Sequence, residues 1–147
     1  MKIVPFDPSQ LEIVSREDAE QIFDRFSLNE IAEAWCAYHV TKDKRHWWAV
    51  DLLWSDPYLY DRDRREKLIE LLIETAPSDD VIAVVAAGPL EDAIYDADEC
   101  VSWLEGRAAT SPRFQQALGT VWIWDQVSAE RFARIERAAR RALPRPS

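Results

Sequence analysis

The segment Asp80-Val-Ile-Ala-Val-Val-Ala-Ala-Gly-Pro-Leu-Glu-Asp-Ala-Ile-Tyr95 joins an apolar run to an acidic helix start. Its residues 81–87 include four β-branched side chains, a pattern that suits either a buried strand or a buried helix. A strand needs neighbouring strands, and no other segment has a convincing strand pattern. Ser78 or Asp79 can cap the start of a helix, and Gly88-Pro89 can stop it. We therefore predict a central helix, apolar on nearly all sides, with the strand as the alternative.

Comparable start and stop signals divide the rest of the chain into short helices. Pro89 suits the first position of the next helix, where its missing N–H is not needed. Ser27 and Glu30 form a capping-box pattern, and Ser15 with Asp18 forms a similar helix start. Further helices are predicted over residues 46–54, 61–75, 99–109, 111–119 and 128–143.

These elements predict an all-α fold of seven to nine short helices in one domain, residues 1–147. The length fits a single domain, and seven Trp, five Phe and four Tyr provide a large apolar core. Packed antiparallel helices, or a short α-solenoid-like array, are the expected arrangement. Residues 1–14 are expected to be extended, 120–124 to continue a bent helix, and 128–143 to form an amphipathic helix with a basic face.

The chain lacks the motifs of several enzyme classes. It has only three glycines, which lie far apart, so neither a phosphate-binding loop nor a dinucleotide fingerprint is present. It also has no G-x-S-x-G nucleophile elbow. His39, Asp43 and His46 have a loose spacing that is more typical of exposed or capping side chains than of metal ligands. We therefore predict no cofactor, no metal and no catalytic residue.

Cysteine content and hydropathy indicate a cytoplasmic protein. Cys36 and Cys100 are the only cysteines, and two reduced core thiols are the better interpretation than a disulfide. The start of the chain lacks the apolar stretch of a signal peptide. The longest charge-free run, residues 114–124, is too short to span a membrane.

The charge is acidic and unevenly distributed. The formal net charge is −9, yet residues 128–147 hold six Arg and two Glu, so residues 1–127 carry −13. Nucleic acids bind basic surfaces, so a nucleic-acid partner is not expected. An acidic body fits a basic protein partner, although solubility alone is the more common reason for such a charge.

The best candidate for a binding surface is an acidic string near the helix that Pro89 starts. Within it, Asp92 and Asp96 are four residues apart and face the same way on a helix. Trp47 or Trp48 is the expected apolar anchor. The acidic candidates are Glu91, Asp92, Asp96, Asp98 and Glu99.

Two alternatives remain open. Glu91 and Glu105 could lie in one cleft and bind a small ligand or perform acid–base chemistry, since crowding separates the pKa values of two carboxylates. Pairing with Arg107 or Arg113 is the more common arrangement of such residues. The chain could also be a structural or oligomeric protein whose surplus tryptophans form a contact between copies.

Several short motifs resemble a family of small bacterial proteins of unknown function. That family has an apolar helix ending in a Gly-Pro-Leu-Glu step, a Glu-containing helix, a Pro-Arg-Phe turn and a terminal Val-Trp. This chain departs from it at Asp96-Ala-Asp-Glu99, where relatives often have a glycine. The resemblance covers about residues 47–124 and rests on 84–92, 101–105, Ser111-Pro-Arg-Phe114, Ala117-Leu118 and Val121-Trp122.

The resemblance implies a helical fold and a bacterial origin, and it brings no established activity. Acidity, abundant aromatic residues and the absence of catalytic motifs together favour a non-enzymatic interaction protein. An inhibitor or immunity-type role is an extension by analogy with other small acidic helical proteins of bacteria.

Overall fold

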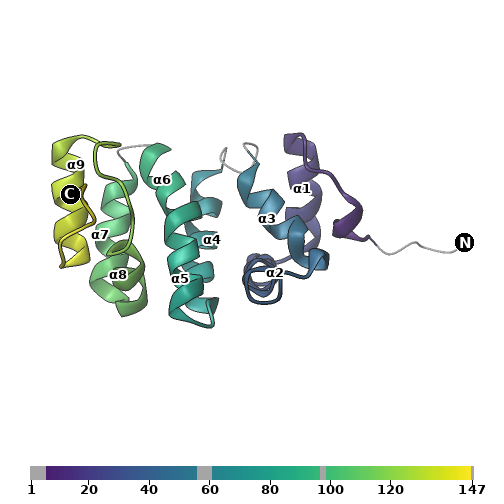
Figure 1. Ribbon diagram of the computed structural model, residues 1–147. Helices are drawn as coiled ribbons and strands as arrows, with labels where there is room; N and C mark the ends of the chain where they lie inside the picture. The colour runs from purple at the N-terminus through teal and green to yellow at the C-terminus, as the bar shows by residue number, and fades with distance from the viewer. Residues whose placement is uncertain (1–5, 56–60, 97–98, 147) are drawn as a thin grey trace, which may run out of the picture. The chain divides into compact units, whose positions relative to one another are not determined.

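The computed structural model describes residues 6–55, 61–96 and 99–146 of the chain. These residues form helices joined by turns and irregular segments, and they contain no strand, so the predicted all-α class is confirmed. Residues 1–71 and 72–147 form two compact units (Figure 1). The predicted organisation as a single domain stays a prediction.

The first unit is built from short helices with few residues between them. Its core is aliphatic and aromatic: Ile22, Ile31, Leu52 and Leu68 are fully buried. Helix α2 packs against α3. The elements are η1 (Pro8–Gln10), α1 (Arg16–Arg25), α2 (Leu28–Thr41), η2 (Lys44–His46), α3 (Trp47–Trp54) and the start of α4 (Arg62–Thr75).

Both predicted N-caps of this unit are present. The Ser27 hydroxyl accepts from the Glu30 amide at 3.1 Å, and the Glu30 carboxylate accepts from the Ser27 amide at 2.9 Å. Ser15 and Asp18 form the same reciprocal pair at the start of α1. Each box satisfies two backbone donors that the first helical turn leaves without partners. The predicted extended segment 1–14 is interrupted by η1, and residues 1–5 lie outside the described part.

The second unit begins with the end of α4. Helix α7 packs against both α8 and α9, and the Trp103 ring meets the Phe114 ring edge-on at 5.4 Å. The further elements are α5 (Asp79–Val85), a π-helical turn η4 (Ala86–Leu90), α6 (Glu91–Asp96), α7 (Cys100–Thr110), α8 (Pro112–Leu118) and α9 (Ala129–Ala139).

Residues 81–87 are helical, as predicted, and the strand alternative is wrong. Ser78 is the N-cap, since its hydroxyl accepts from the Val81 amide at 3.3 Å. One side of this helix is more open than predicted, because Val84 is 37% exposed.

The predicted stop at Gly88-Pro89 is also wrong. The helix passes through Pro89 as a π-turn, and the Glu91 amide donates to the carbonyl of Ala86, five residues earlier. Pro89 cannot donate a backbone bond, and the wider turn accommodates that missing donor without ending the helix. Figure 1 shows α5 and α6 following one another along one column.

Residues 120–124 are not the predicted end of a bent helix. Helix α8 ends at Leu118, and 120–127 is non-helical. Val121 and Ile123 are fully buried, whereas Trp122 is 55% and Trp124 38% exposed. Successive side chains of an extended backbone point to opposite sides, so this segment places two indoles on the surface.

The C-terminal helix is shorter than the predicted 128–143. Ser128 caps α9 as expected, and its hydroxyl accepts from the Arg131 amide at 3.1 Å. The helix ends at Ala139 because Arg140 has left-handed backbone angles, with φ 56°. The chain then turns back, and the Leu143 amide donates to Glu136 at 3.0 Å.

Candidate functional site

Glu91 is the buried carboxylate at the start of α6. Only 9% of its surface is exposed, although it stands in an acidic string. The π-turn that precedes it fixes which way the first turn of α6 faces, and π-turns are frequent at functional sites. Tyr95, one helical turn later, places its hydroxyl 2.9 Å from Glu91 Oε1. The spacing of four residues brings both side chains to one face of the helix.

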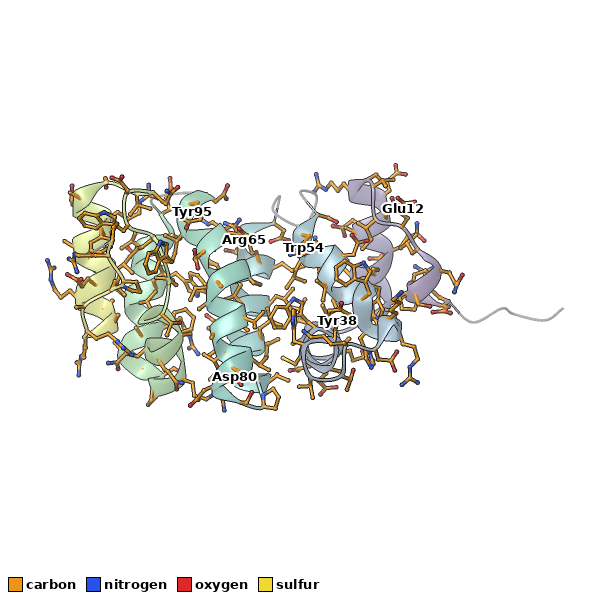
Figure 2. The ribbon with its side chains drawn as sticks, in the orientation of Figure 1. Glu12, Tyr38, Trp54, Arg65, Asp80 and Tyr95 are labelled. Carbon is orange, nitrogen blue, oxygen red and sulfur yellow. The ribbon has the colours of Figure 1, made fainter. Side chains whose placement is uncertain are left out.

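The same two side chains hold the backbone of Trp122. The Tyr95 hydroxyl lies 2.9 Å from the Trp122 carbonyl oxygen, and the Trp122 backbone also favours the charged form of Glu91. The backbone of Trp122 is therefore held against α6 through Tyr95. Figure 2 shows Tyr95 at the C-terminal end of α6. We call Glu91, Tyr95 and the Trp122 backbone the Glu91 cluster.

Burial dominates the electrostatics of the Glu91 cluster. Loss of hydration raises the pKa of Glu91, the bonds from Tyr95 and the Trp122 backbone partly oppose this rise, and the charge of Asp92 adds to it. Burial of the hydroxyl, followed by its bond to Glu91, raises the pKa of Tyr95 to about 12. Tyr95 therefore stays protonated over the range in which Glu91 titrates.

An acidic and aromatic surface surrounds this cluster. Tyr95 is 40% exposed, and the exposed Trp122 side chain projects from the segment that Tyr95 binds. Asp92 and Asp96 on α6 are exposed, as is Glu99 just before α7. The α6 surface is defined here as Asp92, Tyr95, Asp96, Glu99 and Trp122.

Contacts with α9 hold the α6 surface in place within the second unit. Arg131 of α9 donates to the Ile94 carbonyl at 2.8 Å, which satisfies an acceptor near the C-terminal end of α6. The Trp124 ring meets Phe132 edge-on at 5.2 Å, and the Arg145 guanidinium lies 4.7 Å from the centre of the Phe132 ring. The Trp124–Phe132 contact connects the 120–127 segment to α9. The same segment is connected to α6 by the bond between Tyr95 and the Trp122 carbonyl.

A family model described as "Family of unknown function (DUF6869)" matches residues 37–143, well over half of the chain. The chain belongs to this family. The predicted resemblance to a family of unknown function is thereby confirmed, and the matched range is wider than residues 47–124. No curated protein and no solved structure matches the chain.

The DUF6869 region contains all the predicted site residues, and the structure divides them. Asp92, Asp96 and Glu99 lie on the α6 surface, whereas Glu91 lies beneath it. Asp98 is outside the described residues. Glu105 lies on α7 and pairs with Arg134 of α9 at 2.5 Å. That ion pair lowers the pKa of Glu105, chiefly through the hydrogen bond from Arg134.

Arg107 and Arg113, suggested as possible partners of Glu91 and Glu105, have contacts with other groups. Arg107 lies 3.7 Å from Glu74, and Arg113 donates to the backbone carbonyls of Ile73 and Ala76. The two carboxylates of the acid–base alternative have different partners, because Glu91 contacts Tyr95 and Glu105 pairs with Arg134. A hollow of about 260 Å³ beside α9 is lined by other described residues: Val101, Ser128, Glu130, Arg131 and Arg134.

The two predicted tryptophan anchors lie in the first unit and differ in exposure. Trp48 is a core residue, 7% exposed, and its ring lies 4.9 Å from that of Phe26. Trp47 is 36% exposed and belongs to a row of rings, 5.2 Å from Tyr38 and 5.3 Å from Trp54. Trp54 is 71% exposed. Figure 2 labels the two ends of this row, Tyr38 and Trp54.

Sequence analysis missed Tyr95 and Trp122 as surface residues. The alternation Val121-Trp-Ile-Trp124 is the signal that could have found Trp122, because a period of two indicates an extended segment with one side exposed. Tyr95 has a weaker signal, its spacing of four from Glu91.

The described residues contain neither a membrane-spanning helix nor a cluster of metal-ligating side chains. None of the helices in this part combines the length and apolarity needed to cross a membrane. In the same residues, no group of three or more His, Cys, Asp or Glu side chains is placed to hold a metal ion.

Proposed function

We propose that this chain is a non-enzymatic protein-interaction module of the inhibitor or immunity type, which binds a basic segment of a partner protein at the α6 surface. The observation that carries the proposal is the juxtaposition of exposed aromatic rings with exposed carboxylates. Trp122 and Tyr95 supply the rings, and Asp92, Asp96 and Glu99 supply the negative charge.

The chemistry of this surface fits arginine and lysine side chains. A guanidinium can stack on an indole or phenol ring while it bonds to a nearby carboxylate. A cation–π contact contributes about 0.5–1 kcal/mol at an exposed site and about 2 kcal/mol when it is desolvated. Exposed ion pairs contribute about 0–1 kcal/mol each. Trp122 is therefore the expected hot spot, and the carboxylates select for a basic partner.

Charge and compartment support the same proposal. The net charge of −9 favours fast association with a basic protein. Cys36 and Cys100 are both buried as thiols, which fits a cytoplasmic protein. The proposed contact needs neither a cofactor nor a catalytic group.

The test compares two tryptophan variants on different surfaces. Trp122→Ala removes the ring of the α6 surface, and Trp54→Ala, the matched control, removes the exposed ring of the first unit. The partner is captured from the native host with the immobilised wild type, and its affinity is then measured by calorimetry. We expect Trp122→Ala to weaken binding at least about tenfold, the effect of losing a hot-spot side chain. We expect Trp54→Ala to bind like the wild type.

A partner that is lost with Trp54→Ala but retained by Trp122→Ala would contradict the assignment to the α6 surface. Light scattering on the same proteins tests the oligomeric alternative, which the exposed row of Tyr38, Trp47 and Trp54 favours. Self-association of the wild type that is abolished by Trp54→Ala would support that alternative instead.

A further inference from the structure

When Glu91 is ionised, the Tyr95 hydroxyl has one hydrogen for two acceptors. The Tyr95 hydroxyl has one hydrogen, and it lies 2.9 Å from each of two acceptors, Glu91 Oε1 and the Trp122 carbonyl oxygen. An ionised carboxylate only accepts hydrogen bonds. One hydrogen must then serve both acceptors, of which the Glu91 carboxylate is buried and the Trp122 carbonyl lies at an exposed site, and at least one of the two bonds is weakened.

One proton on Glu91 removes this conflict. A protonated Glu91 donates from Oε1 to the Tyr95 oxygen, and the Tyr95 hydroxyl then donates to the Trp122 carbonyl. The Glu91 carboxyl, the Tyr95 hydroxyl and the Trp122 carbonyl then each have a partner, and the Trp122 carbonyl is held by α6.

We infer that Glu91 is a proton-dependent latch that fixes the 120–124 segment, and with it the Trp122 ring, against α6. Protonation closes the latch, and loss of the proton releases the carbonyl side of Trp122. The latch itself is a property of the second unit alone. Its effect on partner binding rests on the proposed function.

The surroundings of Glu91 favour the protonated form. Burial is the largest contribution, and the charge of Asp92 acts in the same direction. Among the described residues, no positively charged group contributes to the raised pKa of Glu91. Arg131, the cation that α9 brings to α6, donates to the Ile94 carbonyl. Titratable groups on the elements around Glu91 are Asp92, Tyr95 and Asp96 on α6, Cys100, Glu105 and Arg107 on α7, Asp125 in the 120–127 segment, and Glu130, Arg131, Arg134, Glu136 and Arg137 on α9.

The latch predicts an unusual sign for the pH dependence of binding. Carboxylates alone attract a basic partner more strongly as the pH rises, because they become ionised. Glu91 acts in the opposite direction, because its deprotonation loosens the segment that presents Trp122. Above the pH at which Glu91 loses its proton, the affinity should therefore fall although the surface becomes more negative.

The latch can be tested on the protein without a partner. The titration of Glu91 is followed by the NMR shift of its carboxyl carbon, and the Trp122 amide by its shift and its hydrogen exchange. We expect Glu91 to titrate at a higher pH than the exposed glutamates, with the Trp122 amide changing at the same midpoint. Its protection, corrected for intrinsic exchange, should fall by about fivefold, the factor for one ordinary hydrogen bond.

Glu91→Gln is the informative variant because its uncharged amide can donate to the Tyr95 oxygen, as the protonated acid does. It should keep the Trp122 protection of the closed state at every pH. Glu33→Gln, which changes an exposed carboxylate of the first unit, should behave like the wild type. Asp92→Asn gives an independent test: it removes a neighbouring charge and should lower the midpoint of the Trp122 change.

Two outcomes would overturn the latch. In one, Glu91 titrates together with the exposed glutamates. In the other, Trp122 responds to pH equally in the wild type and in Glu91→Gln. Failure of the proposed function looks different: no basic partner binds, while Glu91 and Trp122 still titrate together. With a partner in hand, the affinity of the wild type should fall through the Glu91 midpoint, and that of Glu91→Gln should not.

Discussion

Arg113 illustrates how a single side chain can serve the backbone of a distant helix. Its Nε donates to the Ile73 carbonyl at 3.1 Å, and another guanidinium nitrogen donates to the Ala76 carbonyl, so it satisfies acceptors at the C-terminal end of α4. The sequence suggested a carboxylate as a possible partner of this arginine, because a bond to a distant backbone carbonyl leaves no pattern in a sequence. The Arg113→Ala variant leaves those carbonyls without this donor, and we expect the free energy of unfolding to fall by about 1–2 kcal/mol. Urea denaturation measures this change, and Arg137→Ala, which removes an exposed arginine of α9, should stay within about 0.5 kcal/mol of the wild type. Equal losses in both variants would mean that net charge, rather than the carbonyl bonds, accounts for the effect.

The helices were predictable where their caps are local, and the π-turn was not. Ser27 and Ser78 cap α2 and α5 as their sequence positions indicate, because a cap depends on residues three apart. The π-turn at Pro89 and the non-helical 120–127 segment depend on contacts beyond the local sequence, including the bond from Tyr95 to the Trp122 carbonyl. Gly88 tests whether the π-turn itself requires a glycine. Its φ is not positive, and an added Cβ would meet nothing within 4 Å. Gly88→Ala should therefore raise the free energy of unfolding by about 0.4–1 kcal/mol, since alanine loses less backbone entropy on folding. Gly106→Ala in α7, which also has open space, is the matched comparison for thermal denaturation. A destabilised Gly88→Ala beside a stabilised Gly106→Ala would show that the turn needs a glycine.

For the molecule as a whole, titrating carboxylates of two kinds set the response of stability to pH. Hydrogen bonds from Arg64, Arg134 and Arg145 are the largest causes of a lowered pKa at Glu20, Glu105 and Glu136 respectively. A lowered folded-state pKa contributes stability that is present above the unfolded-state pKa and is lost as the pH falls through the folded-state value. Burial raises the pKa of Glu91 instead, so its contribution is present at low pH and is lost as the pH rises through its folded-state value. The urea midpoint should therefore fall on acidification because the ion pairs are lost, and, on the alkaline side of its maximum, it should also decline as the pH rises through the folded-state pKa of Glu91. Glu91→Gln should reduce the alkaline decline, to which Glu66 also contributes because burial raises its pKa, and it should keep the acid decline. Sodium chloride at 0.5 M (about a 4 Å screening length) should weaken the acid decline, because the paired side chains are partly exposed. An alkaline decline as large in Glu91→Gln as in the wild type would assign it to other groups, such as Glu66.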